Sequence, residues 1–195
     1  MSSYHHGDLR DALLDAAVEL ARKGGSVAVG IRELAPRAGV SPTAACRHFA
    51  DRDDVLRAVA RVGIAELEAS MLRRLRRVRG ADPADRARRR SRALGQAYDE
   101  FALAEPGLFA VAFDEVTFAD CTAPYQHLSD ALDGCVESGF VDRDKRGGAE
   151  LICWTGVHGF SMLHSTGPLR DMPHRDRGAD LARILDRIED SLRRA

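Results

Sequence analysis

The chain has 195 residues, of which 45% are hydrophobic and 30% charged, and its formal net charge is -1. This length suits one or two domains with a sizeable core, and no apolar run approaches the roughly 18 residues that span a membrane. We therefore expect a cytoplasmic protein without membrane contact, and the nearly neutral charge gives no general attraction to polyanions.

The first predicted helix runs from about Asp8 to Lys23. Asp8 is a suitable N-cap residue, and Asp11 completes a weak capping box. Apolar residues then recur on one stripe of the segment, at Leu9, Ala12, Leu13, Ala16, Ala17 and Leu20. Gly24 and Gly25 end this helix, which we expect to pack its apolar stripe against the helices that follow.

Residues 31–49 have the pattern of two short helices joined by a tight turn. In the first helix the apolar residues follow the helical spacing i, i+3, i+4 and i+7, at Ile31, Leu34, Ala35 and Ala38. Gly39 can take the left-handed conformation that ends a helix, and Ser41 followed by Pro42 is a favoured helix start. Pro36 removes a backbone hydrogen bond inside the first helix, so we expect a local distortion there.

This pattern is a helix-turn-helix, in which the second helix enters the major groove of DNA and flanking polar groups hold phosphates. The residues placed to meet base edges are Thr43, Ala44 and Arg47, with Ser41 at the cap. His48 and Arg52 follow at a spacing suited to the phosphate backbone. The alternative is a plain αα-hairpin, because a Gly-Val-Ser turn is not specific by itself.

Three stretches together resemble the tetracycline-repressor (TetR) family. The segment LAPRAGVSPTAACRHFADRDDVLRAV resembles its helix-turn-helix, YHHGDLR resembles the lead-in of one branch, and CWTGVHGFSML is similar to a signature in that branch's C-terminal domain. The resemblance implies DNA contacts at Arg32, Thr43, Ala44, Arg47, His48 and Arg52. Cys46 stands where the family usually has a phosphate-contacting tyrosine, so we expect that contact to be lost or weakened. His5 and His6 lack partner ligands, and we interpret them as an arm near the DNA backbone.

A long fourth helix is predicted from Asp51 to about Arg79. Asp54 lies at the position that caps reciprocally with Asp51, and the helix would be roughly 40 Å long, enough to link two domains. From Arg73 to Arg92 the chain has ten arginines against two aspartates. We interpret this Arg-rich stretch as a solvated helix surface and loop rather than as part of the DNA contact.

Further helices are predicted along the rest of the chain, and no alternating strand pattern occurs. Their approximate bounds are Pro83 to Ala104, Pro124 to Gly139, Gly148 to Ser165 and Ala179 to Arg194, while residues 107–113 are apolar but too short for their period to decide. The predicted fold is therefore all-α. Residues 1–52 would form an N-terminal three-helix helix-turn-helix domain, and residues 53–195 a helical ligand-binding and dimerisation domain.

Aromatic residues on these helices are candidates for the walls of a ligand pocket. They are Phe101, Phe109, Phe113, Tyr125, Trp154 and His158. Cavities between helices with aromatic walls are ordinary ligand sites, and the lack of a nearby cationic cluster predicts a largely apolar effector that is neutral or weakly cationic. The alternative is that Trp154 is a packed core residue and that a backbone carbonyl satisfies His158.

The last helix carries an apolar stripe that predicts a homodimer. Its members are Leu181, Ile184, Leu185, Ile188 and Leu192. Such a stripe is more apolar than a monomer surface should leave exposed. In the resembled family the last two helices of two subunits form a four-helix interface, and a two-fold dimer also matches a palindromic operator.

Motifs for chemistry are missing from the sequence: it has no nucleophile elbow, phosphate loop or metal-ligand spacing, so we expect neither an enzyme nor a cofactor or metal. Cys46, Cys121, Cys135 and Cys153 form no C-x-x-C pair, and we interpret them as small buried groups, with a redox role for one as the alternative. We predict a one-component repressor that binds double-stranded operator DNA as a homodimer and is released by a small-molecule effector. The alternative class is an all-helical enzyme or adaptor in which the turn is structural.

Overall fold

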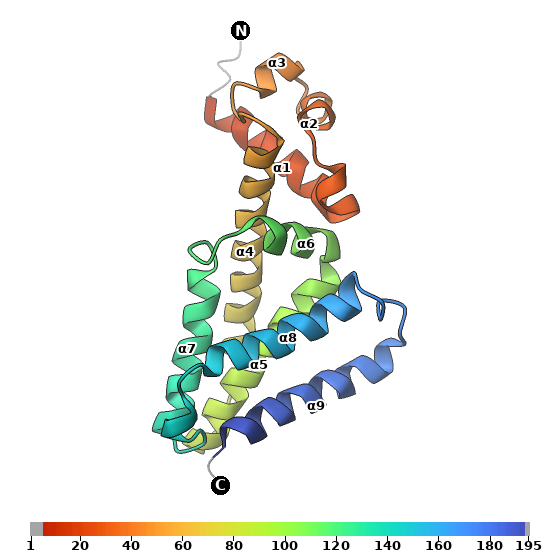
Figure 1. The fold of residues 1–195 in the computed structure, drawn as a ribbon. Helices are drawn as coiled ribbons and strands as arrows, with labels where there is room; N and C mark the ends of the chain where they lie inside the picture. The colour runs from red at the N-terminus through yellow and green to blue at the C-terminus, as the bar shows by residue number, and fades with distance from the viewer. Residues whose placement is uncertain (1–5, 194–195) are drawn as a thin grey trace. The chain divides into compact units, whose positions relative to one another are not determined.

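The computed structural model describes residues 6–193, and over this range the chain is all-α, as predicted (Figure 1). The α-helices are α1 (His6–Gly24), α2 (Ile31–Arg37), α3 (Pro42–Ala45), α4 (Arg52–Leu75), α5 (Pro83–Ala104), α6 (Pro106–Glu115), α7 (Thr122–Glu137), α8 (Ala149–Ser165) and α9 (His174–Leu192). The short 3-10 helices are η1 (Gly25–Ala28) and η2 (Arg143–Lys145). None of the described helices is long and apolar enough to cross a membrane.

Contacts divide the chain into two compact units. The N-terminal unit comprises the chain up to residue 65 together with residues 105–120, and the C-terminal unit comprises residues 66–104 and the chain from residue 121. Helix α4 contributes to both units. The predicted boundary after residue 52 separates a DNA-binding from a ligand-binding function, and it stays a prediction. The boundary between the two packed units falls later, after residue 65 within α4, and α6 packs with the helix-turn-helix.

Helix α6 belongs to the N-terminal unit because its small and apolar residues fit closely against α1 and the first half of α4. A Cβ at Gly107 would collide with the carbonyl oxygen of Ala21, and a Cβ at Gly63 would lie 2.9 Å from the Cβ of Ala112. Leu108 and Phe109 are both fully buried. The apolar segment 107–113, whose period was undecided, is therefore helical and lies in the core of this unit.

The predicted end of α4 and the predicted start of α9 differ from the structure. Helix α4 ends at Leu75 rather than near Arg79, because the chain tightens into i→i−3 hydrogen bonds, from Arg77 N to Arg74 O at 3.0 Å and from Val78 N to Leu75 O at 3.1 Å. Helix α9 begins at His174 rather than near Ala179, directly after Pro173. A proline with its fixed φ is well suited to precede the first turn, so the helix starts before the apolar stripe does.

The C-terminal unit packs α7, α8 and α9 around α5. Glycines allow the closest approaches, since a Cβ at Gly95 would lie 3.0 Å from Leu185 Cδ2 and one at Gly156 would lie 3.0 Å from Ile188 Cδ1. One apolar cluster of this unit consists of Ala87, Leu132, Cys135, Val141, Ala149, Cys153 and Leu192. The large apolar side chains of α9 therefore face the interior of the subunit.

This packing corrects the reasoning behind the predicted dimer stripe. Leu181, Leu185 and Leu192 are only 7%, 6% and 3% exposed in a single chain. Because they are covered within the subunit, the argument that a monomer would leave them exposed is wrong. The large exposed apolar residues of this helix pair lie instead on α8, where Leu151 is 68% and Ile152 46% exposed.

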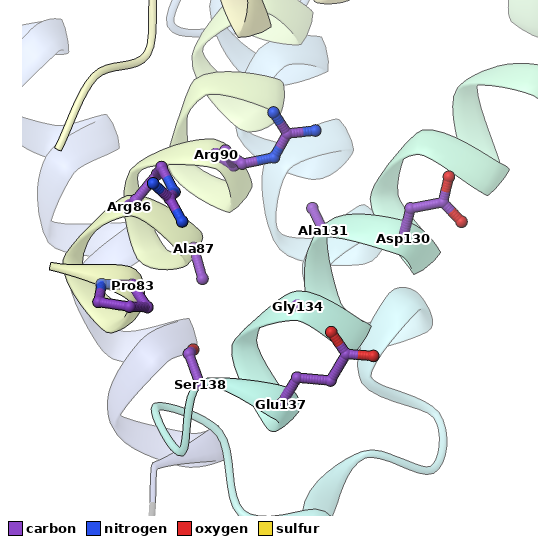
Figure 2. Close-up of a pocket in the computed structure, with 9 residues that line it drawn as sticks. All are labelled: Pro83, Arg86, Ala87, Arg90, Asp130, Ala131, Gly134, Glu137 and Ser138. Carbon is purple, nitrogen blue, oxygen red and sulfur yellow. The ribbon is translucent and has the colours of Figure 1, made fainter. Parts of the chain in front are cut away.

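A surface groove of about 290 Å³ runs between α5 and α7 (Figure 2). Its floor is made of small side chains, because Ala87 and Ala131 are buried where the two helices meet. Charged side chains of both helices rise on either side of this floor. The groove belongs entirely to the C-terminal unit, and we call it the α5–α7 groove.

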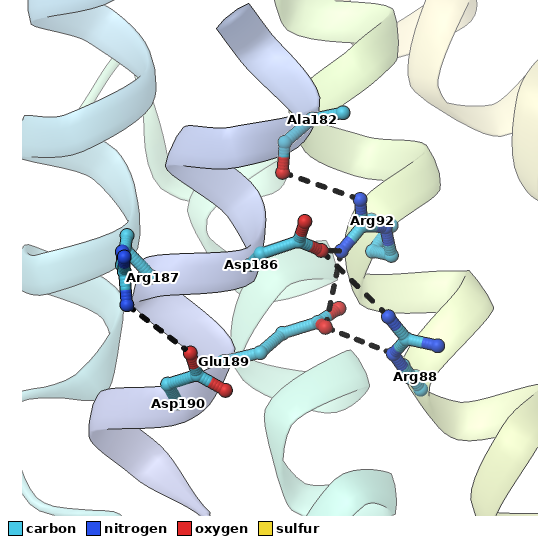
Figure 3. Close-up of polar contacts among 7 residues, drawn as sticks. All are labelled: Arg88, Arg92, Ala182, Asp186, Arg187, Glu189 and Asp190. Atoms are coloured by element: carbon cyan, nitrogen blue, oxygen red, sulfur yellow. Dashed lines mark hydrogen bonds and ion pairs between the residues drawn. The ribbon is translucent and has the colours of Figure 1, made fainter. Parts of the chain in front are cut away.

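Helix α9 is tied to α5 by a network of ion pairs (Figure 3). Glu189 pairs with Arg88 at 2.8 Å and with Arg92 at 3.0 Å, and Arg92 also pairs with Asp186 at 2.7 Å. Near the start of the Arg-rich stretch, Arg74 pairs with Glu100. The stretch is therefore a solvated surface only in part, since several of its arginines are committed to neighbouring helices.

Candidate DNA-binding surface and effector site

The turn between α2 and α3 has the predicted geometry. Gly39 takes the left-handed conformation with φ of +68°, and Val40 N donates to Ala35 O at 2.9 Å. Ser41 then caps α3 with its Oγ, which accepts a hydrogen bond from Ala44 N at 3.2 Å, and Pro42 occupies the first turn. Pro36 lies in the last turn of α2, so the helix ends at the next residue and is shortened rather than lost.

Helix α3 is shorter than predicted, because regular helix covers only Pro42–Ala45. Beyond it the backbone continues in tighter turns, with Arg47 N donating to Ala44 O at 3.2 Å and His48 N to Ala45 O at 2.9 Å. Ala45 and Phe49 are 2% and 1% exposed and anchor the inner face. Thr43 and Arg47 are exposed, and Ala44 is partly so, which leaves the residues expected to meet base edges at the surface.

The residues expected to hold phosphates differ in their exposure and in their contacts. Arg32 is exposed, His48 is half-buried, and the exposed Arg52 uses its guanidinium inside the unit. Arg52 Nε donates to Val29 O at 2.9 Å, and its Nη2 donates to Ser26 O. Arg52 therefore fastens the end of η1 to the start of α4, and only its other N–H groups remain for a phosphate.

The N-terminus of α4 carries its own carboxylate caps, as predicted. Asp51 Oδ1 accepts from Asp54 N at 2.7 Å, and Asp54 Oδ2 accepts from Ala50 N at 3.2 Å. A helix N-terminus attracts anions through its unpaired N–H groups and its dipole. Because two carboxylates already occupy this end, it is a poor place for a DNA phosphate.

Two further features of this surface bear on the sequence interpretation. The guanidinium of Arg10 lies 4.9 Å from the ring centroid of Phe49, a cation–π contact that no short-range sequence signal could indicate. Cys46 is exposed at the C-cap of α3, which corrects the expectation that all four cysteines are buried. Tyr4 and His5 lie outside the described residues, as do the side chains of His6 and Asp8.

The other cysteines match the expectation. Cys121, Cys135 and Cys153 are buried. Burial raises the pKa of Cys135 to about 11 and that of Cys153 to about 12, so both stay as unreactive thiols at neutral pH. Within residues 6–193 no group of three or more His, Cys, Asp or Glu side chains is placed to hold a metal ion.

In the C-terminal unit, a hydrogen bond joins the side chains of Tyr98 on α5 and His158 on α8. The Tyr98 hydroxyl lies 2.7 Å from His158 Nδ1, and the two rings meet edge to face. Burial raises the pKa of Tyr98 and lowers that of His158, so a protonated hydroxyl faces a neutral imidazole at neutral pH. The tautomer of the ring decides which of the two donates, and the Tyr98 hydroxyl is one hydrogen-bond partner of His158.

The predicted pocket residues divide between the two units. Phe101, Tyr125, Trp154 and His158 belong to the C-terminal unit, where the rings of Tyr125 and Trp154 have centroids 6.1 Å apart. Phe109 and Phe113 belong to the N-terminal unit, where they pack on one another with centroids 4.9 Å apart. The six residues are therefore distributed over both units, and their role as one pocket stays a prediction.

A second buried polar cluster in the C-terminal unit was not predicted. Ser161 Oγ donates to Asp99 Oδ1 at 3.0 Å, and both side chains are buried, as is His164. His164 Nδ1 bonds to Phe160 O at 2.9 Å, while its Nε2 has no hydrogen-bond partner among the described residues. Burial raises the pKa of Asp99 despite the Ser161 hydrogen bond. Asp99 and Ser161 are far apart in sequence, so no spacing rule could have joined them.

Two models of known protein families match this chain, one in its N-terminal part and one in its C-terminal part. The model of bacterial regulatory proteins of the tetR family matches residues 13–59, and that of the tetracyclin repressor-like C-terminal domain matches residues 91–188. The first match spans the helix-turn-helix, and the second covers half of the chain. No curated protein matches the sequence.

Solved structures share the whole architecture. A protein of unknown function from Rhodococcus sp. RHA1 is 27% identical, with 100% of each chain covered and a TM-score of 0.81. A TetR family transcription regulator from Marinobacter aquaeolei VT8 is 17% identical, with 94% of this chain and 95% of that one covered and a TM-score of 0.63. The TetR family regulator PfmR from Thermus thermophilus is 20% identical, with 93% and 99% covered and a TM-score of 0.60. At these last two identities the likeness concerns the fold alone.

Proposed function

Because the chain belongs to the TetR family of DNA-binding transcription regulators, we propose that it is a cytoplasmic one-component repressor that binds a palindromic operator as a homodimer. Regulators of this family are transcription factors rather than enzymes. The observation that carries the proposal is the exposed edge of α3, where Thr43 and Arg47 lie at the surface above the buried anchors Ala45 and Phe49. Side chains in this arrangement can meet base edges without disturbing the core.

The proposed dimer uses the outward face of α8. Leu151, Ile152 and Leu163 are 68%, 46% and 44% exposed, which is unusual for large apolar side chains in a monomer. Between them the exposed Thr155 and the open position at Gly159 would let a second helix approach closely. Two-fold pairing through this face would present two copies of α3 to the two halves of a palindrome.

The proposed effector site lies in the C-terminal unit around Phe101, Tyr125, Trp154 and His158. The neutral His158 and the Tyr98 hydroxyl supply a polar anchor without a charge, which suits a largely apolar effector that is neutral or weakly cationic. To release DNA, the effector must prefer one conformation, and a tenfold preference supplies only about 1.4 kcal/mol. Helix α4 is the natural transmitter, since it is one continuous helix with residues in both units.

The test begins with selection of genomic fragments by the purified full-length protein. We expect the recovered fragments to share two inverted half-sites, and scrambling one half-site should abolish the specific mobility shift. Trp154 fluorescence can then be titrated with candidate effectors in the presence and absence of the operator. Failure to enrich any sequence would refute operator binding, whereas an effector that binds free and DNA-bound protein equally would refute release alone.

A further inference from the structure

The α5–α7 groove has walls of opposite charge (Figure 2). Arg86 and Arg90 lie on the α5 side, and Asp130 and Glu137 lie on the α7 side. The spacing follows helix geometry, because residues one or two turns apart project from the same face of a helix. Each helix therefore lines the groove with like charges, arginines on α5 and carboxylates on α7.

These four charges do not neutralise one another. All four side chains are exposed, and within the described part of the chain none of them forms an ion pair. Arg86 has only a long contact of 3.4 Å to the carbonyl of Gly80, and Asp130 accepts from the uncharged Gln126 at 2.7 Å. By contrast, the nearby Arg88 and Arg92 pair with the carboxylates of α9. The groove therefore has two guanidinium groups and two carboxylates that are available to pair with a ligand.

The floor of the groove is open. A Cβ built at Gly134 meets no atom within 4 Å, so the space above this residue is free for another molecule. The volume of about 290 Å³ lies at the small end of ligand sites, which fits a molecule the size of an amino acid or dipeptide. The floor offers little apolar area, because Ala87, Ala131 and Gly134 are small.

We propose that the α5–α7 groove binds a small zwitterion, with its carboxylate on the arginine side and its ammonium on the acidic side. A guanidinium holds a carboxylate through paired N–H donors, and an ammonium has three donors for the opposite carboxylates. A simple anion would be repelled by Asp130 and Glu137, and a simple cation by Arg86 and Arg90. The site shares no residue with the proposed effector site, so it would bind a second ligand.

The test compares three related probes that carry different charged groups. Glycylglycine is a zwitterion at neutral pH, N-acetylglycylglycine lacks the ammonium, and glycylglycinamide lacks the carboxylate. Amide resonances of Ala87 and Gly134 in the isotope-labelled full chain report binding. We expect a saturable shift with glycylglycine and at least severalfold weaker binding of the other two at equal ionic strength. Equal binding of all three probes, or no saturable shift, would overturn the proposal.

Variants separate the groove from general surface charge. Arg90→Gln and Asp130→Asn should each weaken glycylglycine binding about two- to fivefold, the range of an exposed ion pair. Gly134→Leu should abolish binding by filling the open floor while leaving all four charges in place. If Gly134→Leu folds, as judged by its spectrum elsewhere, and still binds, the ligand lies outside the groove; if it does not fold, the two charge variants decide. Resonance shifts that follow protein concentration without a probe would assign the groove to a second copy of the chain and overturn the proposal.

Discussion

The Tyr98 hydroxyl lies 2.7 Å from Nδ1 of His158, which joins two helices, α5 and α8, whose residues are sixty positions apart in the chain. If the hydroxyl is the donor, the bond holds the ring in the tautomer with its proton on Nε2. The same tyrosine ring also meets the His158 ring edge to face, so one residue of α5 orients the histidine of the Trp and His-Gly signature. This relationship is the polar centre of the proposed effector site.

If the hydroxyl donates to Nδ1, replacing Tyr98 with Phe should raise the pKa of His158, because the neutral ring loses a hydrogen bond that stabilised it. We also expect a loss of about 1 kcal/mol of stability at neutral pH. In the native protein, burial lowers the pKa of His158 below its ordinary value. The contribution of His158 to stability is therefore complete at pH values above the ordinary histidine pKa, and it is lost as the pH falls from that value through the lowered one. An NMR titration of His158 provides the measurement, and an unchanged pKa in Tyr98→Phe would show that the hydrogen bond has no such effect.

Replacing Asp99 with Asn should stabilise the protein at pH 7. Burial raises the folded pKa of Asp99, so the ionised carboxylate is disfavoured, and this group's contribution to stability falls as the pH rises from its ordinary pKa to the raised one. Asn keeps an oxygen that can accept from Ser161 Oγ but carries no charge. Thermal melts at pH 7 and at acid pH should show a gain at pH 7 that disappears in acid. A loss at pH 7 would mean that Asp99 is needed as a carboxylate, and Ser161→Ala serves as the control for the hydrogen bond itself.

Replacing Arg47 with Ala should weaken binding to the selected operator by about 1 to 3 kcal/mol, the range for a side chain that pairs with a guanine edge. The loss should be specific to the operator, with little change for unrelated duplexes. Arg37→Ala is the matched control, since Arg37 is also exposed but lies at the end of α2. Unchanged operator affinity in Arg47→Ala would remove this residue from the contact surface.

Replacing Arg52 with Ala should reduce stability by about 1 to 2 kcal/mol, because two hydrogen bonds to the carbonyls of Ser26 and Val29 are lost. Arg52→Lys should not restore the stability, since an ammonium lacks the planar fork that reaches both oxygens. If Arg52 also holds a phosphate, the salt dependence of DNA binding falls by about one unit. Denaturation and DNA titrations of the same variants separate the two roles, and an unchanged melting temperature would contradict the structural one.

A charge on the outward face of α8 should produce monomers. Leu151→Glu places a carboxylate where the structure leaves a leucine 68% exposed, so the subunit itself should fold normally. Leu185→Ala is the contrasting variant, because Leu185 is buried within the subunit and its truncation should cost about 2 to 5 kcal/mol. Sedimentation of both proteins gives the answer. A dimer that survives Leu151→Glu would place the interface elsewhere.

The sequence by itself determined the helical class, the turn at Gly39 and Ser41, the capping of α4 by the carboxylates of Asp51 and Asp54, and the family. These features depend on contacts between residues that are near neighbours in the chain, so their spacing carries the information. The tertiary structure decided what lies inside and what lies outside. An apolar stripe such as that of α9 shows that one face is covered but not by which partner. Only packing revealed that, within the subunit, α5 lies against Leu185 and α8 against Ile188. In the same way, the hydrogen-bond partners described for Arg52, His158 and Asp99 come from distant segments of the chain. A buried polar group needs a partner, but no local sequence pattern identifies which distant residue supplies it.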